Sequence, residues 1–190
     1  VPAGIQVGLG VRPAATYRIH EQGNFVQTQN QFDMAIQGRG YFNIDLPNGE
    51  TGYTRAGNFG LNDQGILVTA NGFQVQPGIT IPDDAIDVTI NESGEVLVRL
   101  DGQVAAQNVG QITMTTWINE AGLQNIGDNL YLESEASGAP IAGVPGDVGF
   151  GNVLQGFLES SNVDVVTEIT SLITAQRSYE FNSQVVQASD

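Results

Sequence analysis

Short hydrophobic runs separated by turn residues fill the middle of this chain, from Tyr41 to Leu132. Glycines recur between the runs and helix signals are nearly absent, which is typical of β structure. Near the C-terminus the hydrophobic residues recur instead at three- and four-residue spacing, as they do on one face of an α-helix. The pattern predicts a mainly β fold with one long C-terminal α-helix.

The clearest hairpin signal is a turn in the first part of the β region. Pro47, Asn48 and Gly49 suit a tight turn, because Asn and Gly tolerate positive φ angles. We therefore expect a hairpin that joins residues 41–46 to residues 52–56.

Two further turns, at residues 62–65 and 91–94, each lead into a hydrophobic run, at 66–68 and 95–98. They predict a weakly duplicated hairpin. The turn at 91–94 faintly resembles a calcium loop, but it lacks the alternating aspartates and the glutamate at the twelfth position that such a loop needs. An ordinary turn is therefore the better interpretation.

The segments around the β region predict the domain organisation. Residues 122–129 are expected to form an irregular loop, followed by a short strand at 130–132. The two ends of the region are rich in Gly, Gln, Asn, Ala and Pro, which favour extended segments. We predict an extended N-terminal arm at 1–33, an inserted β domain at 34–146, and a returning arm with the C-terminal helix at 147–190.

The C-terminal pattern predicts a helix over about residues 163–188, roughly 40 Å long at 1.5 Å per residue. Ser161 or Asn162 can cap its first free N–H groups, and Asp164 and Glu168 place negative charge at the positive end of the helix dipole. A second long helical pattern is missing from the rest of the sequence. The apolar face of this helix is therefore expected to pack against another segment or another subunit.

Charge and composition exclude several classes of partner. The 190 residues include 6 basic and 21 acidic ones, for a net charge of −15, which repels nucleic acid phosphates and anionic lipid headgroups. We therefore expect no nucleic acid partner. Because no run approaches the roughly 20 apolar residues that span a bilayer, we also expect no membrane insertion. The chain has no cysteine, so a disulfide framework, a thiolate metal site and a cysteine nucleophile are excluded.

The polar residues that could carry chemistry do not form a catalytic set. His20 is the one histidine, and no nucleophile elbow accompanies it, so we interpret it as a surface residue. Asp83 and Asp84 follow a proline and are expected to form a turn, and Glu133 and Glu135 are expected to line one solvated edge. We predict no enzymatic activity, no cofactor and no metal site.

Residues 38–40, Gly-Arg-Gly, could be mistaken for the start of a dinucleotide-binding fingerprint. The third glycine of that motif is replaced by Asn43, and a strand is expected to follow instead of a helix. A steric role is the better interpretation, because glycines let a strand bend or let another backbone approach closely.

Large aromatic side chains are expected to fill the core of the β domain. An exposed carbohydrate-binding face is the alternative. The large aromatic residues concerned are Phe42, Tyr53, Phe59, Phe73, Trp117 and Tyr131.

Several blocks of the sequence, in this order, resemble the signature blocks of bacterial flagellar axial proteins, the family of rod and hook proteins. Two further segments are most similar to the distal rod members of that family. The signature blocks are residues 33–42, 53–59, 159–164 and 173–183, and the two segments are residues 10–13 and 71–77.

The resemblance implies a structural subunit without catalysis. Such subunits polymerise helically into a hollow drive shaft, the distal rod of the flagellar basal body, which crosses the periplasm and transmits motor torque to the hook. The implied partners are further copies of the full-length chain, other rod proteins, the hook protein, the rings around the rod and the flagellar export apparatus. The alternatives are a proximal rod or hook protein of the same family, or a secreted carbohydrate-binding β module.

The family's terminal helices pair, which gives the C-terminal stripe a packing role by resemblance. This chain is expected to be a core that lacks the family's N-terminal helix and the extreme C-terminus, and therefore to be monomeric alone. The residues expected to pack are Val165, Val166, Ile169, Leu172, Ile173 and Tyr179, with Gln176 and Arg177 making polar contacts that fix the register.

Overall fold

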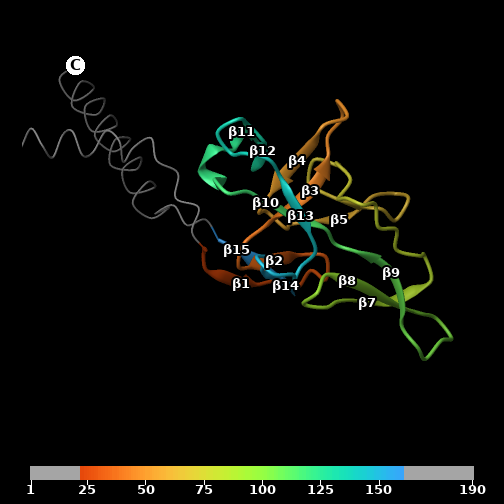
Figure 1. Cartoon of the computed structure of the whole chain (residues 1–190). Helices are drawn as coiled ribbons and strands as arrows, with labels where there is room; N and C mark the ends of the chain where they lie inside the picture. Colours follow the sequence, from red (N-terminus) through yellow and green to blue (C-terminus); the bar gives the residue numbers. More distant parts are fainter. Residues whose placement is uncertain (1–21, 161–190) are drawn as a thin grey trace, which may run out of the picture. The chain divides into compact units, whose positions relative to one another are not determined.

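Strands make up most of the regular structure in the computed structural model, which describes residues 22–160 (Figure 1). Within this range one short 3₁₀ helix accompanies them. The prediction of a mainly β fold is confirmed for these residues. The expected C-terminal helix, and the N-terminal arm up to residue 21, lie outside the described residues.

The strands are short and follow one another closely along the chain. The first eight are β1 (Phe25–Gln27), β2 (Met34–Gln37), β3 (Tyr41–Asp45), β4 (Thr51–Thr54), β5 (Gly60–Leu61), β6 (Leu67–Val68), β7 (Ala85–Ile90) and β8 (Glu95–Leu100). The others are β9 (Gln107–Gln111), β10 (Met114–Thr116), β11 (Gln124–Gly127), β12 (Leu130–Leu132), β13 (Ile141–Gly143), β14 (Asn152–Gln155) and β15 (Phe157–Glu159), with the helix η1 (Glu120–Gly122) between β10 and β11.

The largest sheet has six strands in the order β11-β12-β4-β3-β10-β13, all antiparallel to their neighbours. Its centre is the hairpin of β3 and β4, in which Asn43 lies opposite Tyr53. The turn closes where the N–H of Gly49, at a φ of 88°, donates to the carbonyl of Leu46 at 3.0 Å. The predicted hairpin is confirmed, and its turn uses the glycine for the backbone angle that other residues avoid.

The two faces of β3 enter different cores, because successive strand residues point to opposite sides. Phe42 and Ile44 belong to the main hydrophobic core, whereas Tyr41 joins a second cluster with Tyr53 and Trp117. The rings of Tyr41 and Tyr53 stand edge-on to Trp117, with ring centroids 5.6 and 4.5 Å away. Edge-to-face packing of this kind adds to the gain from burial.

The core placement of the aromatic side chains is confirmed. Four of the six are buried, and the other two, Phe73 and Tyr131, are partly buried and pack against the clusters. The four buried ones are Phe42, Tyr53, Phe59 and Trp117.

Both of the later turns are present and share one device. The side-chain oxygen of Asn62 accepts hydrogen bonds from the N–H groups of Gln64 and Ile66, at 2.9 and 3.0 Å. In the other turn, the side-chain oxygen of Asn91 accepts from the N–H of Glu95 at 2.9 Å. Each asparagine bonds to the backbone that follows it and closes a hairpin, β5–β6 or β7–β8.

The prediction of an irregular loop at residues 122–129 is wrong. The structure has the helix η1 and then β11, which pairs with β12 as the edge of the six-stranded sheet. The turn between these strands is made by Asp128 and Asn129, with φ angles of 54° and 61°, which these two residue types tolerate. All four residues of β11 are exposed, so the strand lacks the hydrophobic alternation that would identify it in the sequence.

The first and last described strands lie side by side (Figure 1). β1 pairs with β15, and β2 with β14, both antiparallel, so the described part of the chain begins and ends in neighbouring strands. The side-chain amide of Gln155 in β14 also bonds to β7, since its oxygen accepts from the N–H of Ile90 at 3.0 Å and its nitrogen donates to the carbonyl of Val88 at 2.9 Å. That contact joins the three-stranded sheet β7-β8-β9 to the entry and exit strands.

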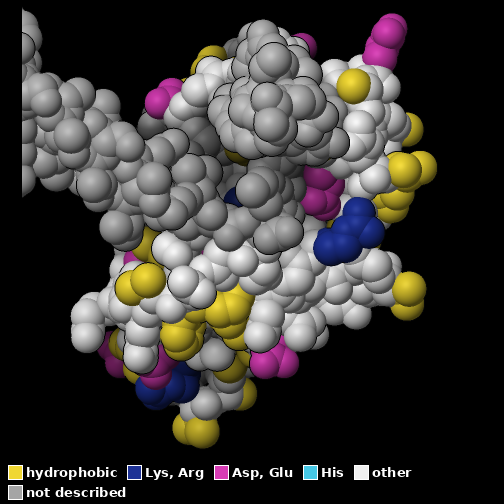
Figure 2. Space-filling view, turned by 90° about the vertical axis from the view of Figure 1, so that its left-hand side faces the viewer, with side chains coloured by type: hydrophobic (Ala, Val, Ile, Leu, Met, Phe, Trp, Pro, Cys, Tyr) yellow, Lys and Arg dark blue, Asp and Glu magenta, His cyan; other side chains and the backbone are white. Residues whose placement is uncertain are grey.

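Basic side chains are sparse on the described surface. Arg39, Arg55 and Arg99 are the basic residues between positions 22 and 160. On the face drawn in Figure 2, basic groups are isolated and acidic groups lie close to them. Each arginine therefore has a different carboxylate partner. Arg55 and Arg39 belong to the sites described below.

Candidate functional site

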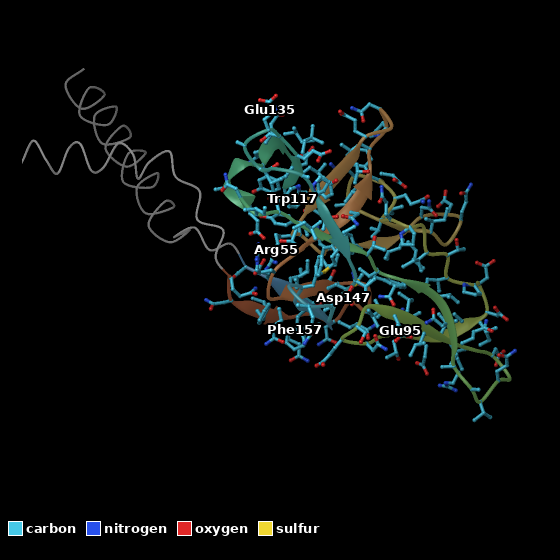
Figure 3. The ribbon with its side chains drawn as sticks, in the orientation of Figure 1. Arg55, Glu95, Trp117, Glu135, Asp147 and Phe157 are labelled. Atoms are coloured by element: carbon cyan, nitrogen blue, oxygen red, sulfur yellow. The ribbon has the colours of Figure 1, made fainter. Side chains whose placement is uncertain are left out.

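The strongest polar cluster of the described residues lies where the chain enters and leaves the fold. Arg55, labelled in Figure 3, directly follows β4, and it forms an ion pair with Glu159 at the end of β15. The guanidinium Nε is 3.1 Å from Glu159 Oε1, and Nη2 is 2.8 Å from Oε2. This is a bidentate ion pair between residues far apart in the sequence, the strongest geometry for an arginine and a carboxylate.

The remaining guanidinium donors of Arg55 go to backbone carbonyl groups. Nη1 donates to Gly38 at 2.7 Å and to Gly40 at 2.8 Å, and Nη2 also donates to Ile36 at 3.2 Å. Arginine carries five N–H donors in a fixed fork, and all five are used here. The side chain therefore joins three parts of the fold: β2, the turn after it, and β15.

The turn at residues 38–40 has the shape that this contact needs. Gly38 and Gly40 have φ angles of 121° and 128°, which L-residues rarely adopt. A Cβ atom on Gly38 would also lie 2.7 Å from the Cα of Gly151. The steric interpretation of the Gly-Arg-Gly motif is confirmed: the glycines let the backbone bend around Arg55 and let a second backbone pass close by.

The carboxylate of Glu159 also holds the incoming chain. It accepts a hydrogen bond from the N–H of Gly23 at 3.1 Å and another from the side chain of Gln22. The N–H of Ser160 donates to the carbonyl of Asn24 at 2.7 Å, which continues the β1–β15 pairing. We call this set, Gln22 to Asn24 with Arg55, Glu159 and Ser160, the junction.

Burial makes the junction pair stronger than a surface ion pair. The side chains of Arg55 and Glu159 are 22% and 11% exposed, whereas Arg99 and Asp87 form a pair with both side chains largely exposed, at 43% and 58%. Charges in a partly desolvated site attract each other more strongly, and removing one partner leaves the other without compensation. The Arg55 Cζ atom also lies 6.0 Å from the centre of the Tyr41 ring, within cation–π range.

Two buried tyrosines, Tyr41 next to Arg55 and Tyr53 in β4, have raised pKa values. Burial raises the pKa of the Tyr41 hydroxyl, and the negative charge of Glu120 raises it further. Burial also raises the pKa of Tyr53, with a smaller contribution from Glu133. Both hydroxyl groups therefore stay neutral to higher pH than a free tyrosine does.

The residues weighed for catalysis are dispersed. Asp83 and Asp84 are both exposed and lie in the turn before β7 of the three-stranded sheet, while Glu133 and Glu135 follow β12 of the six-stranded sheet. Among residues 22–160, no group of three or more potential metal ligands is present. No helix within the described range is long and apolar enough to cross a membrane.

The packing residues expected in the C-terminal helix, from Val165 to Tyr179, lie outside the described residues, as does His20. The junction itself was missed by sequence reasoning. A signal for it existed, because Arg55 and Glu159 each belong to a block that resembles the axial family. Nothing local in either block indicates that the two side chains meet.

Comparisons with known proteins identify two regions of the chain. The model described as the flagellar hook protein FlgE/F/G D1 domain matches residues 35–98, and the model described as the flagellar basal body rod FlgEFG protein C-terminal region matches residues 154–190. Arg55 lies in the first region and Glu159 in the second, so the junction ties the two together.

Whole-chain relatives agree. The flagellar basal-body rod protein FlgG of Caulobacter vibrioides is 58% identical over all 190 residues, which cover 72% of that protein. Its namesake in Agrobacterium fabrum is 50% identical over the same span, also covering 72%. Among solved structures, the hook protein FlgE2 of Helicobacter pylori is similar over 66% of this chain and 28% of that one, at 20% identity and a TM-score of 0.33. The chain belongs to the flagellar basal-body rod protein family.

Proposed function

We propose that this chain is a structural subunit of the distal rod of the flagellar basal body. It polymerises helically into a hollow shaft and transmits motor torque to the hook, and it carries no catalysis. The observation that carries the proposal is the 58% identity, over the entire chain, to a protein named as a basal-body rod protein. Subunits of such a shaft need two different faces that meet repeatedly without closing a ring.

The junction is suited to transmitting mechanical force. Torque that passes between the β unit and the segments on either side of it must cross β1 and β15, because these strands connect the unit to the rest of the chain. Arg55 fixes both to β2 and the 38–40 turn through charge-assisted hydrogen bonds. A stiff connection at this point lets the unit move together with its arms.

The domain plan and the packing residues belong to the same proposal. The arms at 1–33 and 147–190 connect the inserted β domain to the axial core. There the stripe from Val165 to Tyr179 packs against the N-terminal helix of the same or a neighbouring subunit. Other rod proteins, the hook protein, the rings around the rod and the export apparatus are the proposed partners.

The alternatives have less support. A carbohydrate-binding module needs an exposed aromatic platform, but of the six aromatic residues expected in the core four are buried and the other two pack against the core clusters. On the face drawn in Figure 2, hydrophobic side chains stand in separate groups and not in one platform. A proximal rod or hook role stays a second candidate, because the matching family models include both rod and hook proteins.

The test is replacement in a flagellated cell. In Caulobacter vibrioides, the matching 190 residues of its rod protein are replaced by this chain. Basal bodies are then purified from the resulting strain. The proposal predicts motile cells, with peptides of the exchanged chain found by mass spectrometry in rods from which the hook has been removed. Motile cells whose rods lack those peptides would contradict it, and so would peptides found in the hook alone.

A further inference from the structure

One basic group on the described surface stands among exposed hydrophobic side chains. Arg39 donates from Nη2 to the hydroxyl of Thr116 at 3.2 Å and to the carbonyl of Trp117 at 2.9 Å. Its own backbone carbonyl accepts from the N–H of Gly151 at 2.8 Å. These contacts place Arg39 between the end of β10 and the loop that precedes β14.

Exposed aliphatic residues flank Arg39 on these same elements. Ile118 directly follows Trp117, Ile141 lies opposite Thr116 in the β10–β13 pairing, and Val148 belongs to the loop before Gly151. Their exposed fractions are 88%, 47% and 102%. We call Arg39, Ile118, Ile141 and Val148 the arginine patch. Several exposed hydrophobic residues on elements that contact one arginine mark an interaction surface better than single exposed residues do.

The charge of Arg39 is the least compensated of the basic charges in residues 22–160. Arg55 has a bidentate carboxylate partner, and Arg99 is in direct contact with Asp87. The side chain of Arg39 is 58% exposed, and its ion-pair partner Glu120 lies 3.7 Å from Nε, too far for a hydrogen bond. This guanidinium can therefore bind a carboxylate of another molecule.

A groove elsewhere on the same unit has the complementary character. It has a volume of about 280 Å³ and lies between the β5–β6 turn and the start of β7. Phe32, Leu61 and Ile86 supply hydrophobic surface, and Asp63 and Asp83 supply negative charge. Leu61 and Ile86 are 37% and 50% exposed. A cavity of roughly 150 Å³ can hold a benzene ring, so the groove has room for an aliphatic side chain.

We propose that the arginine patch of one subunit docks into this groove of the next copy of the chain. Val148 enters the hydrophobic part of the groove, and Arg39 meets Asp83. The inference rests on the proposed function, because a helical shaft needs two different patches on each subunit that fit each other. Opposite charges on the two patches favour this pairing, whereas copies of so acidic a chain otherwise repel one another.

Cysteine cross-linking tests the contact directly, because the natural chain has no cysteine. Val148→Cys and Ile86→Cys are introduced together into the rod protein carrying this chain, and purified rods are treated with a short bismaleimide. We expect a ladder of covalently linked subunits that neither single variant gives. The matched control pairs Val104→Cys with Ile86→Cys: Val104 is 95% exposed at the tip of the β8–β9 hairpin, outside both patches, and should give no ladder.

Charge reversal provides a second test of the same contact. Asp83→Arg places a second cation opposite Arg39 and is expected to lower the amount of chain recovered in rods about tenfold, a loss of about 1.4 kcal/mol at each contact. Adding Arg39→Asp should restore most of it.

The two proposals fail in different ways. Rods that contain the chain but give no ladder with the Val148 and Ile86 pair would overturn the docking proposal alone, as would a ladder equally strong with Val104. Cross-links of Val148 to a different protein would overturn it too, by showing another occupant. Rods that lack the chain altogether would overturn both the docking and the proposed function.

Discussion

Arg55 connects parts of the described fold that are far apart in the sequence. Its five donors reach carbonyl groups in and after β2 and the carboxylate of Glu159 in β15. Lysine has the same charge but offers a compact ammonium without the planar fork, so it cannot reproduce a bidentate pair and three further bonds together. At this position the geometry of the guanidinium matters more than its charge.

Replacing Arg55 tests this interpretation. We expect Arg55→Ala to lower the free energy of unfolding by about 3 kcal/mol, because it leaves Glu159 partly buried without its partner, and Arg55→Lys to lower it by about 2 kcal/mol through the lost hydrogen bonds. Urea unfolding followed by the fluorescence of Trp117, the one tryptophan of the chain, measures both.

Arg99→Ala is the matched control, because its pair with Asp87 is exposed. Its loss is expected to cost less than about 1 kcal/mol. Equal losses for Arg55→Ala and Arg99→Ala would show that the junction is an ordinary surface contact.

The two buried tyrosines predict an alkaline limit to stability. The folded-state pKa values of Tyr41 and Tyr53 are both raised above the ordinary value of 10.0. Below pH 10 both states keep these hydroxyls neutral, so their contribution is fully present. As the pH rises above 10 the unfolded chain loses protons first, and stability falls.

Unfolding free energies measured between pH 8 and about pH 11.5 check this limit. We expect a flat region up to about pH 10 and a decline above it. The double variant Tyr41→Phe, Tyr53→Phe should decline less steeply over the same interval. An unchanged slope would mean that other groups cause the alkaline loss.

At the scale of the elements, close backbone contacts decide where strands can meet. Gly57, between β4 and β5, lies against the carbonyl of Met34 at the start of β2, and its own carbonyl accepts the N–H of Met34 at 2.9 Å. A Cβ atom on Gly57 would lie 1.7 Å from the Met34 oxygen, far closer than two non-bonded atoms can approach. Gly60, three residues later, has no atom within 4 Å of its own Cβ position.

The two glycines make a matched pair of substitutions. Gly57→Ala is expected to lower the free energy of unfolding by about 3 kcal/mol, because β2 must move away. Gly60→Ala is expected to be neutral or to stabilise by up to about 1 kcal/mol through the unfolded state. Thermal unfolding distinguishes them, and similar melting temperatures for the two variants would contradict the tight packing of this segment on β2.

How far the sequence predicts these elements depends on whether their signals are local. The β3–β4 hairpin could be predicted because Asn48 and Gly49 determine its turn. The strand β11 could not, because its exposed residues lack alternation. The contact between Arg55 and Glu159 joins residues more than a hundred positions apart, and no pattern in a single sequence encodes such a contact.

On the scale of the whole molecule, the fold brings distant parts of the chain together at one place. The entry strand β1 and the exit strand β15 pair, and the junction holds them to the rest of the unit. The regions that match the two flagellar family models meet there.

Electron cryo-microscopy of basal bodies can show whether the chain forms part of the rod with its junction intact, in cells where this chain replaces the matching part of the Caulobacter vibrioides rod protein. We expect the rod to contain this β unit in regular repeats, with β1 paired to β15 and Arg55 in contact with Glu159 in every copy. A rod built without this unit, or one in which β1 and β15 have separated, would contradict it.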